Sequence, residues 1–390
     1  MINTIFMVLL CIITTATTAV SRENETLVHN TSELNQALTQ AKPGHNILIT
    51  PGNYEGGIYI QELNGDLDKT IVIDAADPEK KPVIQGGGNC IHIAEASYLE
   101  IRNLILSGAT GNGLNIDDGG TYETPAHHIL LHGLTVRDIG PEGNRDGIKL
   151  SGVDEFKVKE CFVERWGSGG SGIDMVGCHK GVIEDCTFRH GDDKGSNAIQ
   201  IKGGSKDITI QSCRFEHAGS RAVNIGGSTG LQFFRPDPQG YEAKDITVEG
   251  CSFIGSMAPV AFVGVDGALV RYNKIYRPRK WIMRILQETR GPEFVPCRNG
   301  KFINNIVVFR SDEVSNTVNI GPKTAPETFT FAGNLWYCMD DVDKSKPVLP
   351  APESNGIYGK DPQFCDPEKG DLRLKDGSPV SWNISLFKEN

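Results

Sequence analysis

Two stretches of the chain, Ile183-Glu184-Asp185-Cys186-Thr187-Phe188 and Ile210-Gln211-Ser212-Cys213-Arg214-Phe215, share one pattern. An apolar residue is followed by two variable residues, a cysteine, another variable residue and a second apolar residue. Nine copies occur, with leucine, cysteine or asparagine at the fourth position: Leu104, Leu134, Cys161, Cys186, Cys213, Cys251, Asn273, Asn305 and Asn334. Successive copies are 30, 27, 25, 27, 38, 22, 32 and 29 residues apart. Repeats of this length, with short strands and glycine-rich turns, predict the coils of a parallel β-helix.

A second apolar alternation follows these copies, as in Gly147-Ile148-Lys149-Leu150 and Ala198-Ile199-Gln200-Ile201. One coil cannot bury its own apolar face, but stacked coils share a continuous core. The sequence therefore predicts an all-β protein, a single right-handed parallel β-helix of about ten to twelve coils. The hand follows from the rule for parallel crossovers. The nine pattern positions should form one buried stack.

Four consecutive positions of that stack are cysteines, and coils lie about 4.8 Å apart, so we expect a column of inert thiols. Cys297, Cys338 and Cys365 fall outside the stack, and disulfide pairing among them stays open. The sequence has no CxxC motif or His/Cys spacing typical of zinc.

The ends of the chain differ from the repeats. Residues 1–21 contain an apolar run that fades into small residues, as in a secretory signal, so we expect a secreted or periplasmic protein. Residues 32–42 predict a short capping helix that begins at Ser32 and closes the N-terminal end. The β-helix is expected over residues 25–345. Residues 346–390 lose the repeat, and we expect them to cap the C-terminal end.

Composition bounds the partners. Of the 390 residues, 38% are hydrophobic but only 7% are aromatic. This composition suits a core made of thin stacks of aliphatic side chains. A net charge of −10 argues against nucleic acid as a partner. It also argues against binding to an anionic membrane surface, apart from the membrane crossed during export. An acidic polysaccharide remains compatible, since a local basic groove can lie on an acidic body. We expect a monomer.

An outward-facing polar column follows from the strand alternation. It reads Lys149, Asp174, Gln200, Asn224, Ala261, Arg284 and Asn319, and Lys202 shares its face. Such a column is often only solvated surface. The turns that follow these strands are short at 151–155, 176–180 and 203–206, and long at 117–128, 226–243 and 287–299. Clustered long turns on a rigid scaffold are usually functional, so we expect two walls around a groove. Its floor would carry Lys149, Asp174, Gln200 and Lys202.

The walls carry further candidates for substrate binding: Tyr122, Phe233, Phe234, Arg235 and Tyr241. Aromatic side chains on exposed loops suit stacking on sugar rings, although they also staple loops to the body. The turns before the strands supply His190, His217 and Arg221. His190 and His217 are 27 residues apart, so we expect their imidazoles to stack as a structural pair.

The residues after the predicted helix carry a resemblance to a known family. Lys42-Pro43-Gly44 and Ile49-Thr50-Pro51-Gly52-Asn53-Tyr54 resemble the start of pectin-lyase-like proteins, especially polysaccharide lyase family 6, the alginate lyase and chondroitinase B branch. The resemblance covers about residues 30–340. It implies a catalytic lysine where Lys202 stands and an arginine on the next coil, but that position holds Gly226. The family also implies calcium, for which acidic ligands are not evident.

A second resemblance is incomplete. Asp192-Asp193 and Asn144-Arg145-Asp146-Gly147-Ile148 are similar to motifs of polygalacturonases. In that family the two motifs lie on neighbouring coils, whereas Asp146 and Asp192 are 46 residues and two coils apart. The hydrolase pattern is therefore broken.

Three functions stay open at this point. The first is a polysaccharide lyase that cleaves a uronic-acid-containing glycan by β-elimination. Lys202 would be the base, Arg221 the carboxylate clamp, and Lys149, His190 and His217 reserves for neutralisation or proton donation. Lys149 would lie beside Asp174 and so stay charged, while Lys202 would need a cation such as Arg221 within about 5–8 Å.

The second function is a glycoside hydrolase that uses Asp174 with Asp146 or Asp192 as paired carboxylates. The third is a glycan-binding solenoid without catalysis, in which these charged residues are ordinary surface.

Overall fold

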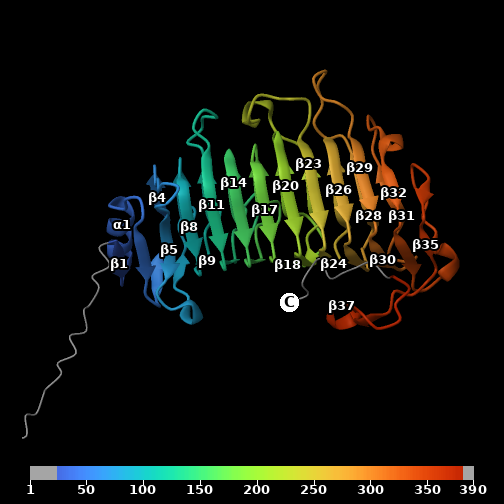
Figure 1. The fold of residues 1–390 in the computed structure, drawn as a ribbon, viewed down its shortest axis with the longest axis horizontal. Helices are drawn as coiled ribbons and strands as arrows, with labels where there is room; N and C mark the ends of the chain where they lie inside the picture. Colours follow the sequence, from blue (N-terminus) through green and yellow to red (C-terminus); the bar gives the residue numbers. More distant parts are fainter. Residues whose placement is uncertain (1–23, 381–390) are drawn as a thin grey trace, which may run out of the picture.

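The computed structural model describes residues 24–380, so the expected signal segment lies outside the described residues. Three long parallel sheets run the length of the described chain and stack as the faces of a solenoid (Figure 1). The chain visits the sheets in turn, so each strand pairs with the strand of the same sheet one coil later. The predicted β-helix is confirmed.

The strands of each sheet are given in spatial order. Sheet A contains β1 (Glu25–Val28), β2 (Asn46–Ile49), β5 (Ile71–Ala75), β8 (Ser97–Arg102), β11 (Ala126–His132), β14 (Val153–Lys159), β17 (His179–Glu184), β20 (Ser205–Gln211), β23 (Ala243–Glu249), β26 (Val265–Arg271), β29 (Arg298–Ile303), β32 (Thr330–Ala332) and β34 (Glu353–Ser354). Sheet B contains β3 (Asn53–Glu55), β6 (Val83–Gln85), β9 (Ile105–Ser107), β12 (Thr135–Arg137), β15 (Phe162–Glu164), β18 (Thr187–Asp192), β21 (Arg214–Ala218), β24 (Ser252–Ile254), β27 (Lys274–Tyr276), β30 (Ile306–Phe309), β33 (Leu335–Cys338) and β35 (Ile357–Tyr358). Sheet C contains β4 (Ile58–Gln61), β7 (Ile91–Ala94), β10 (Leu114–Asp117), β13 (Ile148–Ser151), β16 (Ser171–Val176), β19 (Asn197–Lys202), β22 (Arg221–Gly226), β25 (Ala258–Val263), β28 (Trp281–Leu286) and β31 (Asn316–Ile320).

Between residues 24 and 380, five short 3₁₀ turns lie outside the sheets: η1 (Pro78–Lys80), η2 (Leu231–Phe233), η3 (Pro326–Thr328), η4 (Val342–Ser345) and η5 (Pro367–Lys369). None of the helices in this part of the chain is long and apolar enough to cross a membrane.

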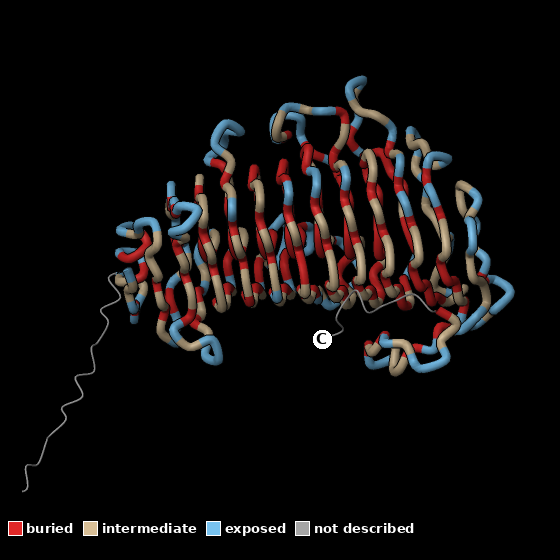
Figure 2. Tube along the Cα trace, in the orientation of Figure 1, coloured by how far each residue is buried: buried red, intermediate tan, exposed pale blue. Residues whose placement is uncertain are grey.

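The nine pattern positions explain the turn from sheet A to sheet B. At each copy two residues separate the strands, and the first has a positive φ of 52–63°: Asn103, Gly133, Glu160, Asp185, Ser212, Gly250, Tyr272, Asn304 and Gly333. One left-handed residue redirects the chain, and the next residue, the pattern position, points inward. All nine pattern residues are at most 2% exposed, as predicted. Figure 2 shows the same alternation of buried and exposed residues along the coils.

Asparagine side chains complete the stack toward the C-terminus. The backbone N–H of Asn273 donates to Asn305 Oδ1 at 3.0 Å, and that of Asn305 donates to Asn334 Oδ1 at 2.8 Å. Asn334 Nδ2 in turn donates to Glu353 Oε1 at 2.7 Å, and Trp336 Nε1 donates to Glu353 Oε2 at 2.9 Å. Glu353 therefore ends the buried ladder.

We expect Glu353→Ala to lower the free energy of unfolding by about 1–3 kcal/mol, because the buried Asn334 amide would lose one of its two acceptors and the Trp336 indole would lose the carboxylate that accepts from it. Urea denaturation followed by tryptophan fluorescence measures the change, with the exposed Glu327→Ala as the matched control. An unchanged midpoint would mean that this carboxylate does not support the ladder.

The cysteines are free thiols. All nine that the structure describes are unpaired, and eight of them are buried. Of the three whose pairing was open, Cys297 and Cys338 are buried and Cys365 is half-buried, and none forms a disulfide.

Both ends of the solenoid differ from the sequence-based expectation. Helix α1 (Thr31–Thr39) is capped by Asn30, whose side chain accepts from Glu33 N, and not by Ser32. It stops before Lys42 because a residue that precedes proline disfavours the helical conformation. At the other end, β34 and β35 carry two sheets on to Tyr358, past the expected boundary at 345.

The chain then forms a small antiparallel pair, β36 (Phe364–Asp366) and β37 (Asp371–Leu374). Phe364 and Leu372 pack against Tyr276 and Val308 of sheet B. The last segment therefore folds back along sheet B and does not simply cover the end (Figure 1).

Candidate functional site

The polar column predicted on sheet C is present. In register, Lys149 lies beside Asp174, Asp174 beside Gln200, and Gln200 beside Asn224. The column continues in register through Ala261 to Arg284. Aliphatic neighbours of each residue point into the core, so the polar side chains lie on the outer face.

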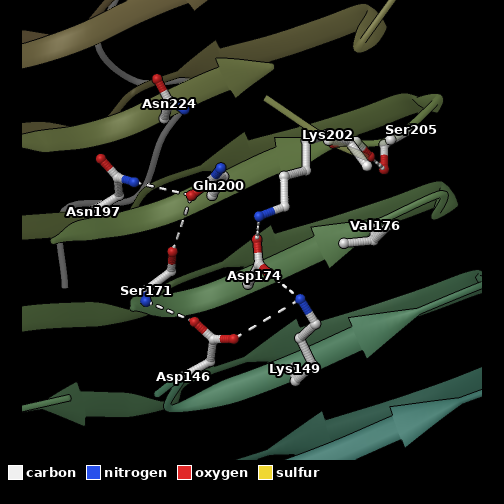
Figure 3. Close-up of polar contacts among 12 residues, drawn as sticks. Asp146, Lys149, Ser171, Asp174, Val176, Asn197, Gln200, Lys202, Ser205 and Asn224 are labelled. Atoms are coloured by element: carbon white, nitrogen blue, oxygen red, sulfur yellow. Dashed lines mark hydrogen bonds and ion pairs between the residues drawn. The ribbon is translucent and has the colours of Figure 1, made fainter. Parts of the chain in front are cut away.

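Asp174 is the centre of this face, between two lysines (Figure 3). Lys149 Nζ contacts Asp174 Oδ2, and Lys202 Nζ lies 3.2 Å from Asp174 Oδ1. The Asp174 side chain is 1% exposed, whereas those of Lys149 and Lys202 are 19% and 15% exposed. Burial by itself would raise the pKa of Asp174, but the two ammonium groups outweigh it and lower that pKa. The site is thus a buried carboxylate covered by two reachable amines.

The contacts of the two lysines differ from the expectation. Asp174 was expected to keep Lys149 charged and so to make it a poorer base than Lys202, but Asp174 contacts both lysines. Arg221, the cation expected within reach of Lys202, is paired with a carboxylate: its Nη2 lies 2.7 Å from Glu288 Oε1. What separates the lysines is a second carboxylate: Lys149 Nζ is 3.9 Å from Asp146 Oδ2. Burial lowers the pKa of Lys149, but Asp174 and Asp146 outweigh burial and raise it.

Asp146 occupies a position that earlier coils give to asparagine. Asn89 Oδ1 accepts from Asn112 N at 2.9 Å, and Asn112 Oδ1 accepts from Asp146 N at 2.9 Å. Asp146 Oδ1 repeats the contact one coil later, accepting from Ser171 N at 2.7 Å. An asparagine would make the same structural bond, so the carboxyl group adds only a titratable oxygen. Burial first, and the neighbouring Asp174 second, raise the pKa of Asp146 to about 7.

Hydrogen bonds and ion pairs fix the remaining polar side chains of this face. Gln200 Oε1 accepts from Asn197 Nδ2 at 2.9 Å, and Asn224 Oδ1 accepts from Arg221 Nη1 at 3.0 Å. Arg284 Nε donates to Asn319 Oδ1 at 2.9 Å, and its guanidinium lies over the Trp281 ring, 4.3 Å from the centroid. Burial, helped by the charge of Arg221, lowers the pKa of Arg284. Sheet C thus carries four basic side chains, Lys149, Lys202, Arg221 and Arg284, and the first three are paired with carboxylates; we call these four the cationic row.

The three long turns are present, at residues 118–125, 227–242 and 287–297, and rise from one edge in Figure 1. They do not stand apart as walls. Arg235 Nη1 in the second turn lies 2.6 Å from Asp118 Oδ2 in the first. The second turn crosses the short turns between them closely: a Cβ at Gly177 would lie 2.3 Å from Arg235 Cβ.

A groove is present at the other end of the sheet C strands, opposite the long turns. It has a volume of about 440 Å³ and lies at the turns that lead into β7, β10 and β13, with Asp146 and Lys149 in its lining. Asp174, Lys202 and the long turns do not line it. This groove shares Lys149 with the predicted site and extends from it toward the N-terminal coils. The predicted cleft between the long turns stays a prediction.

Aromatic residues of the turns fall into two groups. Phe234 is 6% exposed and packs on Phe294 of the third turn, so it staples two loops together. Phe233 is 56% exposed and Tyr122 is 40% exposed, and these remain available for contact. Tyr241 is half-buried under Lys244, whose Nζ lies 5.7 Å from the ring centroid.

The two histidines do not stack on each other. His190 stacks on Trp166 with ring centroids 4.7 Å apart, whereas His217 Nδ1 lies 3.1 Å from Asp193 Oδ2. A register shift between Arg189 and Asp192, where β18 pairs with β21, takes the two imidazoles out of line. Burial lowers the pKa of His190, and the hydrogen bond to Asp193 raises the pKa of His217. Neither contacts the lysines or Asp174 in the described structure.

The residues of the site do not fit a calcium ion. In the part of the chain that the structure describes, no group of three or more His, Cys, Asp or Glu side chains is placed to hold a metal. Asp174, the most buried acid on this face, is already neutralised by two lysines.

Comparison with known proteins agrees on the fold. A family model described as a right handed beta helix region matches residues 89–236. The chain has the right-handed β-helix fold. An alginate lyase from Paenibacillus is 15% identical, with 78% of this chain and 98% of that chain covered and a TM-score of 0.50. The pectate lyase Pel9A is 12% identical, with 88% of this chain and 84% of that chain covered and a TM-score of 0.52. The Dettilon tailspike protein is 10% identical, with 84% of this chain and 61% of that chain covered and a TM-score of 0.54. No curated protein sequence matches this chain. At such identities the likeness concerns the fold, and it confirms the fold-level resemblance drawn from the sequence.

Proposed function

We propose that this β-helix protein is an exported polysaccharide lyase that cleaves a uronic-acid-containing glycan by β-elimination. The observation that carries the proposal is the cationic row, four basic side chains along one face of a protein whose net charge is −10. A local row of cations on an acidic body favours an anionic polymer laid along the solenoid axis. The alginate and pectate lyases of similar fold act on polymers of this kind.

The chemistry uses three groups of the site. A base removes the proton on C5, next to the sugar carboxylate, and the electron pair forms the C4–C5 double bond. The C4–O bond breaks, and an acid gives a proton to the departing oxygen. A cation beside the carboxylate stabilises the negative charge that develops during proton removal.

Lys202 is the proposed base. Its ammonium group has one carboxylate contact, at 3.2 Å, whereas Lys149 has both Asp174 and Asp146 as partners. Burial lowers the pKa of Lys149, but Asp174 and Asp146 outweigh burial, so Lys149 keeps its charge to neutralise the substrate carboxylate. Lys202 is then the remaining amine of the site. Asp146 is the proposed acid, because burial and the neighbouring Asp174 raise its pKa to about 7, so that about half of these carboxyl groups carry a proton at pH 7.

One observation favours a glycoside hydrolase as a second candidate. The pKa of Asp146 is raised while that of Asp174 is lowered, and such a split is the usual mark of an acid–base carboxylate pair. Against it, both oxygens of Asp174 are held by lysines and its side chain is 1% exposed.

The test is incubation of the purified protein with a panel of acidic and neutral polysaccharides. We expect absorbance of unsaturated uronate to appear with an acidic polymer. New reducing ends without that absorbance would favour the hydrolase. Retention of a polymer in affinity electrophoresis without any cleavage would favour a glycan-binding solenoid.

A further inference from the structure

The groove at the turns before β7, β10 and β13 adjoins the cationic row at Lys149, which belongs to both. Its lining comes from three consecutive turns: Gly88–Asn89, Thr110–Asn112 and Asn144–Asp146. Because neighbouring coils lie about 4.8 Å apart, these turns place equivalent groups at regular intervals along the solenoid axis. The groove continues the face of Lys149 toward the N-terminal coils.

The asparagine ladder determines what this groove offers a ligand. Asn89 Oδ1 and Asn112 Oδ1 each accept a backbone N–H from the next coil at 2.9 Å. With their oxygens engaged, the hydrogen-bonding groups these side chains keep free are the Nδ2 amides, which are donors. Apart from the Asp146 carboxyl group, the side chains of the lining therefore offer mainly donors, which suits a ligand rich in acceptors.

Arg145 adds a positive charge at the same place. It is exposed, and its Nη1 donates to the carbonyl oxygen of its neighbour Asn144 at 3.4 Å. Among residues 24–380 no carboxylate forms an ion pair with it, in contrast to Arg221, which is paired with Glu288. A guanidinium without an acidic partner, in a strongly acidic protein, favours a carboxylate supplied by a ligand.

We propose that this groove is a binding subsite for a second acidic sugar, whose carboxylate pairs with Arg145 while its hydroxyl groups accept from Asn89 and Asn112. The subsite rests on the proposed function, because it binds the next part of the same glycan chain. The substrate would then run along the axis from Lys202 through Lys149 toward the N-terminal coils. Arg145 and Lys149 lie on the same coil and both line the groove.

The test is calorimetric titration in a Lys202→Ala background, which is expected to bind without turnover. The probes are tetrasaccharides of galacturonic acid and of mannuronic acid, and the methyl esters of these tetrasaccharides. We expect added Arg145→Ala to weaken binding of an acidic tetrasaccharide by about tenfold or more, as for loss of one charge-assisted pair. Binding of the methyl esters, which carry no carboxylate for Arg145, should not change. The control is Arg310→Ala, which removes an arginine of a distant turn that pairs with Asp312.

The outcomes separate the subsite from the function. If acidic tetrasaccharides bind and Arg145→Ala leaves their affinity unchanged, the subsite is wrong and the proposed function stands. If no acidic oligosaccharide binds and no acidic polysaccharide of the panel is cleaved, both are wrong. A kinetic measurement tests the subsite even if the double variant does not fold. In the otherwise unmodified protein, Arg145→Ala should raise KM for long substrates and leave kcat nearly unchanged. An unaltered KM would overturn the subsite.

Discussion

Lys202→Ala is expected to lower turnover of an acidic polysaccharide by about 10²–10⁴-fold, the usual contribution of a positioned base. Lys202 lies on the outer face of β19, and its amine reaches Asp174 from the side opposite Lys149. Its removal leaves Asp174 paired with Lys149, so no buried charge is left without a partner. The stability of the fold should therefore change little, and the loss should appear in kcat.

Lys180→Ala is the matched control. Lys180 is a lysine of the neighbouring sheet A, 65% exposed and paired with Glu155 at 3.0 Å. It should retain full activity. If Lys202→Ala stays active while Asp174→Asn is inactive, the base is not Lys202 and the hydrolase interpretation gains support.

Asp146→Asn should give the second large effect, a fall in kcat by about 10²-fold or more, because amide nitrogen cannot give a proton to the departing oxygen. The ladder bond should survive, since Asn89 and Asn112 make the equivalent contact in the two preceding coils. In the parent protein, activity should fall as pH rises through about 7, where Asp146 loses its proton. That falling limb should be absent from the residual activity of the variant.

Stability gives an independent check on the same residue. The pKa of Asp146 is raised above its ordinary value of 3.8, so its contribution to stability is complete below that value and is lost as pH rises through about 7. The amide that replaces the carboxyl group would titrate in neither the folded nor the unfolded state. We therefore expect Asp146→Asn to melt higher than the parent at pH above 7 and to lose that advantage in acid. Parallel melting curves at all pH values would contradict the raised pKa.

The repeat predicted the core better than the surface. Burial alternates with a fixed period, so positions such as Cys186 and Asn305 could be placed on one stack from spacing alone. The same alternation placed Lys149, Asp174 and Lys202 on one outer face. Which amine contacts which carboxylate depends on side-chain conformation across coils, and the spacing carries no information on it.

Two errors have specific causes. A register shift beside Arg189 separated His190 from His217, and strand spacing does not reveal such shifts. The long turns looked like open walls because loop length says nothing of the salt bridge between Asp118 and Arg235. The role of Asp146 did have a signal: it stands two residues before Ile148, as Asn112 stands before Leu114 and Asn89 before Ile91. An acid in a column otherwise begun by asparagines marks a position where charge serves a purpose beyond structure.

Removal of the C5 proton is the central claim, and proton NMR of the cleaved glycan tests it most directly. After incubation of the protein with the acidic polysaccharide that it degrades, the new chain end should show a vinylic C4 proton and no C5 proton. A new end that keeps its C5 proton and a saturated ring would contradict the lyase account.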